Sequence, residues 1–381
     1  MKKFRNFTAA RSRGRLGDLR LEALIRPPKR VFINNADSYS SGYIARFLCD
    51  PTGKLLVDAE IDIEKDKVDL KLPGALQIVG TVSEKSDENR LFMLEEYFGL
   101  NRDELLPKLL ESDVIIYNIS QHEDQVEEAM WALTALHKDI AQFSGPKTFI
   151  LISTVLTWVC IKPGPNELVF PFTDHDFLKR RPHPNFKPHY DLERMVVKVG
   201  KNDRSLFSTY VVVSGLQYGM GEQVFHYFFK TSWLGRENEI PVFGEGNNTI
   251  PTIHIVDLAS VIHEVIKHQP EPYYLLAVDS AKNTMKEIVK AVATTLGPGK
   301  IQNKPFQEVY LTQDLSMLEI DSLRVNLRLD GVLVRELFEV NWRYESGLVT
   351  NIEQMVEEYR QIRGLEVQHC LAVKSKHRKQ Y

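Results

Sequence analysis

Short apolar runs and amphipathic segments alternate along most of the chain. Runs rich in β-branched and other apolar residues predict buried strands at residues 31–33, 76–79, 112–118, 148–154, 207–213 and 273–278. Apolar residues at helical spacing predict helices at residues 95–110, 125–140, 224–234, 286–296 and 352–363. Because strand and helix alternate, the sequence predicts an α/β fold with a doubly wound, mostly parallel sheet.

The pattern divides the chain into a larger and a smaller part. We expect residues 30–215 to form the main sheet domain and residues 216–363 to form a smaller α/β carboxy-terminal lobe. The later strand around Ile253 to Val256 fits either part, so this boundary stays open. Three charged segments lie outside this core, namely a basic arm at 1–29, an acidic insert near 50–75 and a basic tail at 364–381.

The composition is that of an ordinary globular protein. Of the 381 residues, 43% are hydrophobic and 26% are charged, and the net charge of -3 indicates neither nucleic acid nor a membrane as partner. The three cysteines are odd in number and far apart, which favours a reducing, cytoplasmic compartment over a disulfide framework. No apolar run approaches the roughly 18 residues that span a bilayer.

The first 30 residues hold ten Lys or Arg side chains, with Asp18 and Glu22 as the acids. We interpret this arm as a solvated segment, and a more specific alternative is a docking arm for an acidic partner such as tubulin on a microtubule surface. A mitochondrial presequence also begins Arg-rich and acid-poor, but the later part of the sequence favours other destinations.

A polar turn and a helix follow the first strand. This arrangement opens a dinucleotide-binding sheet, in which glycines let the turn approach a pyrophosphate. Here Asn35, Ser38 and Ser41 stand about where the glycines would fall, and Gly42 remains nearby. The four residues are the candidate cofactor-binding residues of a degraded clamp, so we expect no cofactor, with NAD(P) as the alternative.

The second predicted strand gives the same indication. In a dinucleotide-binding sheet, an acidic residue at the end of this strand binds the adenosine ribose. The strand here ends Gly80-Thr-Val-Ser83, and the first carboxylate is Glu84. A second element of cofactor recognition is therefore missing or displaced.

Several later blocks share their order and spacing with one family. They are Asp113-Val-Ile-Ile, Ile152-Ser-Thr, Tyr218-Gly, Pro241-Val-Phe-Gly-Glu-Gly246 and Ile253-His-Ile-Val-Asp-Leu-Ala259. From about residue 30 to 363, the chain resembles the extended short-chain dehydrogenase/reductase family of sugar epimerases and dehydratases. The resemblance implies a Rossmann-like sheet and, in the active members, hydride transfer with NAD(P).

Hydride transfer in this family needs a Tyr acid–base with a Lys four residues later. Ser153 and Thr154 match the residues that position the substrate hydroxyl, and the dyad spacing offers Tyr190 and Arg194. Arg cannot replace the Lys, because its guanidinium is bulky and always charged. A second alignment, anchored on Glu193, puts Asn185 and His189 at the dyad positions. Either way we expect no catalytic residues, with Ser153, Thr154, Tyr190 and Arg194 as vestigial candidates.

The sequence also resembles ciliary adenylate kinases in which a reductase-like region precedes the kinase domain. The matching blocks are residues 31–34, 37–42, 113–118, 215–219, 250–254 and 297–301. No G-x-x-x-x-G-K-[ST] phosphate loop occurs, so we expect no kinase activity in this chain. The resemblance implies a non-catalytic scaffold of the motile cilium or flagellum axoneme, bound to axonemal proteins. The alternative is an NAD(P)-binding reductase, epimerase or nucleotide sensor with divergent residues.

Other polar residues are better explained by structure than by chemistry. His175, His183 and His189 lie near Asp174 and Asp176, but their spacings match no usual metal-ligand pattern, so we expect no metal site. A basic patch, Lys179-Arg-Arg-Pro-His183, faces solvent or a partner protein in this interpretation. His254 and Asp257 stand at a strand-to-helix junction, where we expect Asp257 to cap the helix.

Overall fold

The computed structural model describes residues 28–51, 76–84, 90, 92–121, 124–161, 171–202, 204–235 and 238–364. The predicted basic arm, acidic insert and basic tail lie almost wholly outside these residues. Within them, no helix is both long enough and apolar enough to cross a membrane.

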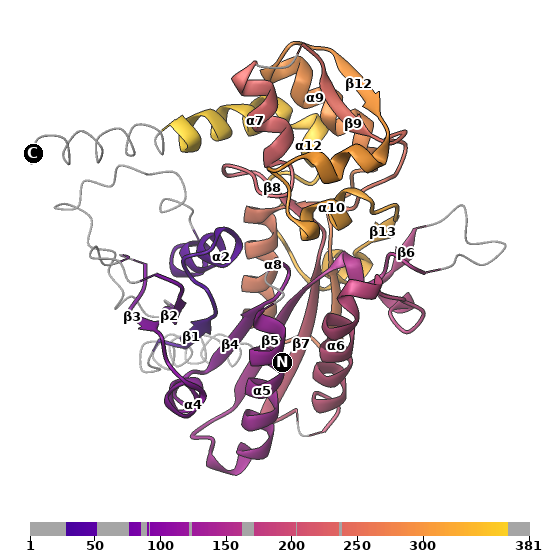
Figure 1. Ribbon diagram of the computed structural model, residues 1–381. Coiled ribbons are helices and arrows are strands. Elements are labelled where there is room, and N and C mark those ends of the chain that lie inside the picture. Colours follow the sequence, from indigo (N-terminus) through magenta and orange to yellow (C-terminus); the bar gives the residue numbers. More distant parts are fainter. Residues whose placement is uncertain are drawn as a thin grey trace, which may run out of the picture.

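The main body is a seven-stranded sheet with the strand order β11-β7-β5-β4-β1-β2-β3 (Figure 1). The strands are β1 (Arg30–Ile33), β2 (Gln77–Val82), β3 (Glu95–Phe98), β4 (Val114–Asn118), β5 (Lys147–Thr154), β7 (Phe207–Ser214) and β11 (Tyr274–Ala277). Neighbouring strands all pair in parallel, which confirms the predicted doubly wound sheet. The order reverses at β1, so the carboxyl ends of β1 and β4 frame the crevice where such sheets bind ligands.

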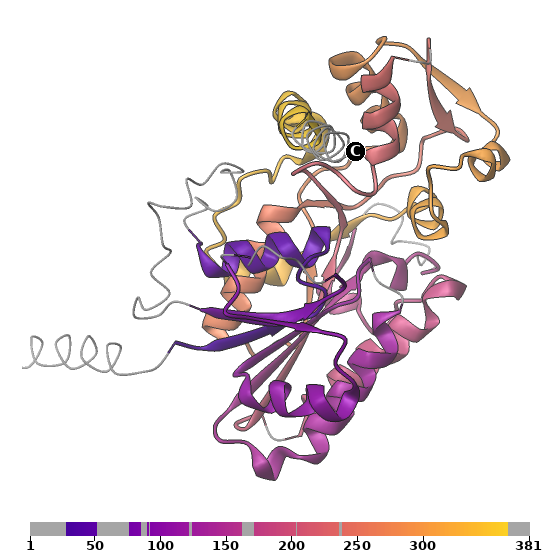
Figure 2. The same ribbon diagram turned by 60° about the vertical axis from the view of Figure 1, so that its left-hand side comes forward.

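Helices cover both faces of this sheet. On these faces lie α2 (Tyr39–Cys49), α4 (Arg102–Glu111), α5 (Gln125–Lys138), α6 (Lys187–Val199) and α8 (Ile255–His268). The other helices of the described chain are α7 (His226–Leu234), α9 (Met285–Leu296), α10 (Met317–Leu323), α11 (Val332–Leu337), α12 (Gly347–Thr350) and a helix at 352–364. In Figure 2 the indigo α2 and the salmon α8 lie on one face, and α4, α5 and α6 lie on the other. The side chains of β1 alternate accordingly, since Val31 and Ile33 pack into the α2 side and Phe32 into the opposite side.

One predicted helix begins later than expected. The sequence pattern predicts a helix over 95–110, whereas Glu95–Phe98 is the edge strand β3, paired with β2. Helix α4 starts only after Asn101, whose side chain accepts from the Asp103 and Glu104 amides in a capping box. The capping box fixes the start of the helix, so residues 95–98 are free to extend the sheet.

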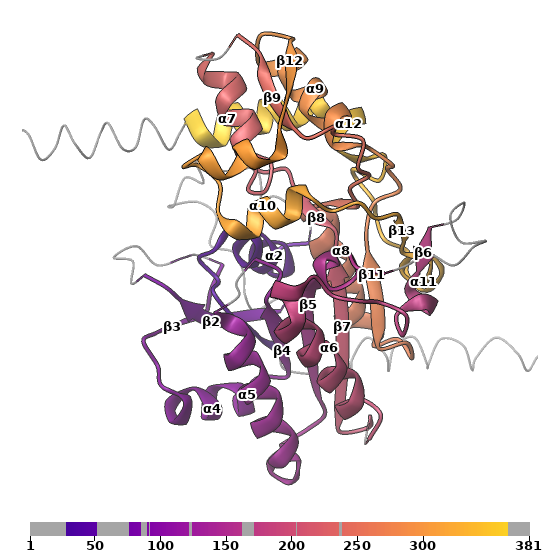
Figure 3. The same ribbon diagram turned by 45° about the vertical axis from the view of Figure 1, so that its right-hand side comes forward.

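The later residues form a lobe above the carboxyl edge of the sheet (Figure 3). Its short sheets pair β9 (Ile240–Phe243) with β12 (Ile301–Lys304), and β8 (Leu216–Tyr218) with β10 (Thr252–His254). Another short pair joins β6 (Phe172–Thr173) to β13 (Leu329–Asp330).

The domain boundary differs from the expected one. Ile253 belongs to β10 and pairs with β8, outside the main sheet. Strand β11 joins the main sheet beside β7, and α8 packs on its face against α2. Residues 216–363 are therefore not one separate lobe, because the chain returns from β10 through α8 to complete the sheet.

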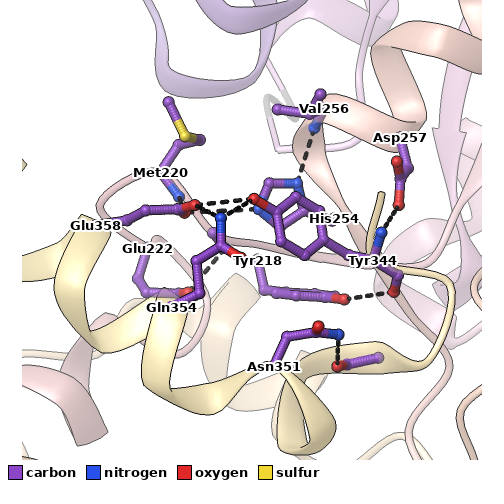
Figure 4. A network of polar contacts seen from close by, with 12 residues as sticks. Tyr218, Met220, Glu222, His254, Val256, Asp257, Tyr344, Asn351, Gln354 and Glu358 are labelled. Atoms are coloured by element: carbon purple, nitrogen blue, oxygen red, sulfur yellow. Dashed lines mark hydrogen bonds and ion pairs between the residues drawn. The ribbon is translucent and has the colours of Figure 1, made fainter. Parts of the chain in front are cut away.

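A polar network attaches the helix at 352–364 to this body (Figure 4). His254 is fully buried, and its Nδ1 accepts the Val256 amide at 3.2 Å, so His254 caps α8. Asp257 instead accepts the backbone amides of Arg343 and Tyr344, each at 2.9 Å, so the predicted cap at Asp257 is wrong. His254 Nε2 lies 3.7 Å from Glu358 Oε2, which joins the last helix to the start of α8.

Glu222 is a second buried acid in this network. Its Oε1 accepts the Gly219 amide at 2.8 Å, and the Arg363 guanidinium donates to its backbone carbonyl at 3.1 Å. Burial raises the pKa of Glu222 from 4.5 to about 8. Glu358 differs, because contacts with His254, Met220 and Tyr344 outweigh burial and lower its pKa. Near pH 7, Glu222 is therefore protonated, whereas Glu358 is charged.

We predict that Glu222→Gln makes stability less dependent on pH. Between pH 4.5 and about 8, folded Glu222 keeps a proton that the unfolded chain releases. Its stabilising contribution is thus complete below pH 4.5 and is lost as the pH rises through about 8. Burial of Asp279, whose pKa rises to about 7, acts with the same sign. Burial of His189, whose pKa falls from 6.5 to about 4, acts with the opposite sign below pH 6.5. From pH 6.5 to about 8 the Tm should therefore fall as pH rises, and it should fall less steeply in the variant.

Thermal unfolding followed by circular dichroism across this pH range measures the effect. The control is Glu353→Gln, which makes the same change at an exposed residue of the helix at 352–364. Its pH profile should follow that of the unaltered chain. Parallel pH profiles for Glu222→Gln and the unaltered chain would contradict the prediction.

Candidate functional site

The turn after β1 leads into α2 and contains one residue with a positive φ. Asn35 has φ 46°, in the left-handed region that Asn tolerates better than most residues. A Cβ on Gly42 would lie 3.1 Å from the Ala36 carbonyl oxygen, so α2 packs closely on the turn here. Ser38 precedes α2 and makes no side-chain cap. The structure thus places Asn35, Ser38, Ser41 and Gly42 at the start of α2, beside the crevice.

Side chains hydrogen-bonded to one another fill the crevice between β1 and β4. Asn118 donates from its backbone to Asn34 Oδ1 at 2.6 Å, and Asn34 Nδ2 donates to the Asn118 carbonyl at 3.1 Å. Asn118 Nδ2 then donates to Ser40 Oγ at 2.8 Å and to Ser41 Oγ at 3.3 Å. None of these four residues is exposed to solvent. The first turn of α2 is therefore bonded to β4 where a dinucleotide fold leaves room for the ligand.

The network continues toward the lobe. Ser120 donates from its backbone and its hydroxyl to Asn118 Oδ1, at 3.2 and 2.7 Å. Gln217 Nε2 donates to Ser120 Oγ at 2.9 Å and to Ser214 Oγ at 3.1 Å. Sequence reasoning missed Asn34, Asn118 and Gln217. Polar residues placed directly at the ends of apolar strands were the one available signal.

The end of β2 is also occupied from within the chain. Asp37 Oδ2 accepts the Ser83 amide and hydroxyl, both at 2.8 Å, and the Glu84 amide at 3.1 Å. The carboxylate at this point comes from the β1 turn and is bound to backbone amides. Asp37 thus lies near the end of β2, where a dinucleotide fold has its ribose-binding acid. Its carboxylate holds the turn against β2.

The hydroxyl of Ser153 is similarly committed. It donates to Glu193 Oε1 at 2.6 Å, while Glu193 Oε2 accepts from Arg180 Nε at 2.9 Å and from the Tyr274 hydroxyl at 3.1 Å. Glu193 has no exposed surface, and Arg180 is 4% exposed. Thr154 Oγ1 accepts the Leu156 amide at 3.3 Å and lines a cavity between the sheet and the lobe. Ser153 thus joins a buried ion pair and does not face a substrate.

The two dyad alignments fall on different faces of α6. Tyr190 and Arg194 line a groove on the outer side of α6, and their pairing is a contact of the Arg194 guanidinium 5.8 Å from the Tyr190 ring centroid. His189 is buried, with Nε2 3.3 Å from the Ile119 carbonyl at the end of β4. The structure therefore brings His189, and not Arg194, to the inner position, as in the alignment anchored on Glu193.

The two residues of the alignment anchored on Glu193, buried His189 and exposed Asn185, lack the charge and the acid that hydride transfer needs. Burial lowers the pKa of His189 to about 4, so its imidazole is neutral near pH 7. Asn185, four residues earlier, donates from Nδ2 to Asp321 Oδ2 at 2.8 Å. A neutral imidazole and an amide supply neither a proton-transfer acid nor the cation that lowers the pKa of one.

The remaining cavity between sheet and lobe is small. It has a volume of about 260 Å³ and is lined by residues from the ends of β4 and β5, from β8 and from α10. Pockets for small molecules usually measure about 300–1,000 Å³. Gln121 and Gln223 line it with side-chain oxygens that have no hydrogen-bond partner among the described residues.

The histidines of the Pro-rich segment are not gathered in one place. His183 Nδ1 lies 3.7 Å from Asp321 Oδ2, whereas His189 contacts Ile119. Among the residues that the structure describes, no group of three or more His, Cys, Asp or Glu could hold a metal ion.

Two curated proteins are clearly related to this chain. Adenylate kinase 7 of the mouse, Mus musculus, is 48% identical over 257 residues, which are 67% of this chain and 42% of the mouse protein. Adenylate kinase 7 of Macaca fascicularis is 49% identical over 173 residues, 45% of this chain and 32% of that protein. The chain thus spans less than half the length of the curated relatives it matches.

Solved structures identify the fold. The dTDP-glucose 4,6-dehydratase from Bacillus anthracis, determined with NAD, superposes with a TM-score of 0.61 over 87% of this chain and 97% of the enzyme. The two sequences are 13% identical, so the likeness shows the fold alone. No protein-family model matches the chain. The chain is therefore homologous to part of adenylate kinase 7 and has the Rossmann-like fold of the NAD-dependent epimerase/dehydratase type.

Proposed function

We propose that this chain is a non-catalytic, reductase-derived scaffold of the axoneme of motile cilia or flagella. The observation that carries the loss of chemistry is the buried bonding of Asn34, Asn118, Ser40 and Ser41 in the crevice between β1 and β4. The homology to part of adenylate kinase 7 supports the ciliary placement, because the sequence resembles ciliary adenylate kinases. In this proposal, the relatives' remaining length phosphorylates nucleoside mono- and diphosphates, and a body like this one anchors that activity to axonemal proteins.

The residues in the crevice do not fit NAD(P). The hydroxyls of Ser40 and Ser41 accept from Asn118, and Asp37 is bound to the amides of Ser83 and Glu84. The neutral His189 stands where the family places a cation. A dinucleotide would have to break the buried bonds between Asn118 and the two serines and leave their polar atoms unpaired, at a cost of about 1–3 kcal/mol for each.

The alternative is an NAD(P)-binding reductase or epimerase, or a nucleotide sensor without turnover. Two observations favour it: the superposable dehydratase was determined with NAD, and α2 begins without a side-chain cap. A helix N-terminus without a cap has free amides for a phosphate.

Calorimetry separates the two functions. We expect no heat of binding when NAD or NADP is added to the purified chain at millimolar concentration. A dissociation constant below roughly 10 μM, or about -7 kcal/mol, would instead establish the alternative. The dehydratase of similar fold is the positive control. Tyr190→Phe should change no reductase signal, because Tyr190 lies on the outer face of α6.

The scaffold function is tested in ciliated cells. A fluorescently tagged chain should enter motile cilia and remain on the axoneme after detergent has removed membrane and soluble protein. The tag alone, expressed at the same level, controls for passive entry. Complete release of the tagged chain by detergent would contradict a scaffold role whatever the result of the calorimetry.

A further inference from the structure

A groove runs along the outer face of α6. One part has a volume of about 530 Å³ and a second part about 390 Å³, and both are lined by Leu178, Arg180 and Tyr190. Leu178 is an apolar side chain that is 78% exposed at the edge of the groove. Met195 adds further apolar lining. The groove is separate from the crevice between β1 and β4, because it lies on the opposite side of α6 from His189 and Glu193.

The charge of the groove is strongly positive. Its basic lining residues, besides Arg180, are Lys179, Arg181, Lys187, Arg194, Lys198 and Lys201. The acidic lining residue is Asp191, which pairs with Lys187 at 2.9 Å. Within the described part of the chain, Arg181, Arg194, Lys198 and Lys201 form no ion pair. The lining therefore has an excess of positive charge that its own carboxylates do not balance.

Arg180 supplies an independent indication of a ligand. It is 4% exposed, its Nε donates to Glu193, and its guanidinium lies 4.7 Å from the Tyr190 ring centroid. Its Nη2 is buried and has no hydrogen-bond partner among the described residues. The guanidinium also lies 4.8 Å from the Tyr274 ring centroid. A buried charged donor without a partner is costly, so the groove is lined by a cation whose hydrogen bonds are incomplete.

We propose that the groove binds an acidic segment of a partner protein that carries an apolar side chain. Helix α6 has 13 residues and is thus about 20 Å long, which matches about six residues of extended peptide. Carboxylates would pair with Arg194, Lys198 and Lys201, and the apolar side chain would cover Leu178. A second copy docked face to face would bring like charges together. The proposal does not depend on whether the crevice binds a dinucleotide, and its failure would not contradict the proposed ciliary placement.

Fluorescence anisotropy with the full chain tests the proposal. The probe is fluorescein-labelled Glu-Glu-Glu-Phe-Glu-Glu-Glu, and we expect binding that weakens as salt is added. The double variant Arg194→Glu with Lys198→Glu should lower the affinity on the order of tenfold or more. The matched control, Lys290→Glu with Lys300→Glu, makes the same charge change at exposed lobe positions and should leave binding within about twofold.

Leu178→Ser provides a second variant, at a side chain so exposed that the fold does not require it. It should weaken the probe severalfold, and circular dichroism checks that each variant is folded. Three results would overturn the proposal: equal loss in both double variants, equal binding of a probe with Gln for every Glu, or no effect of Leu178→Ser. Displacement of the probe by duplex DNA or anionic vesicles at lower concentration than by unlabelled peptide would overturn the choice of partner.

Discussion

The structure depends on the requirement that buried polar atoms be hydrogen-bonded. Where β1 and β4 diverge, a dinucleotide-binding fold leaves strand ends and helix amides for the ligand to satisfy. In this chain Asn34 satisfies both the amide and the carbonyl of Asn118, and Asn118 in turn binds the first turn of α2. Bonds within the chain thereby join β1, β4 and α2 at this crevice.

Buried side chains also satisfy one another's hydrogen bonds beneath the lobe. The carboxylate of Glu193 binds the Ser153 hydroxyl, the Arg180 guanidinium and the Tyr274 hydroxyl, and so joins β5, α6 and β11. Loss of one partner of a buried ion pair leaves an uncompensated charge, which costs about 3–5 kcal/mol. Residues placed where a reductase holds its substrate are therefore fixed by stability alone. Bonds of this kind hold the fold together whether or not the crevice carries out chemistry.

The apolar runs were enough to predict the parallel sheet, but not the site. Asn34 and Asn118 are 84 residues apart, and no local pattern indicates that they meet. The sequence left Tyr190 and His189 both open for a different reason: adjacent helical residues point about 100° apart, and the spacing alone does not say which one faces inward. Glu193 indicates which face of α6 points inward, because this acid is buried against the sheet. Edge strand β3, with its acidic Glu95 and Glu96, has no apolar signal to find.

Helix α6 shows what stability does and does not explain. Its inner face, with His189 and Glu193, is bonded to the sheet and is required by the fold. Its outer face brings Arg194, Lys198 and Lys201 together without acidic partners in the described chain, and crowded like charges oppose folding. Arg194 and Lys201 contact the Tyr190 and Tyr273 rings, but no acid balances their charge, and Arg180 keeps an unsatisfied donor beside them. A ligand that balances this charge on binding is the best explanation for such a cluster of cations on the outer face of α6.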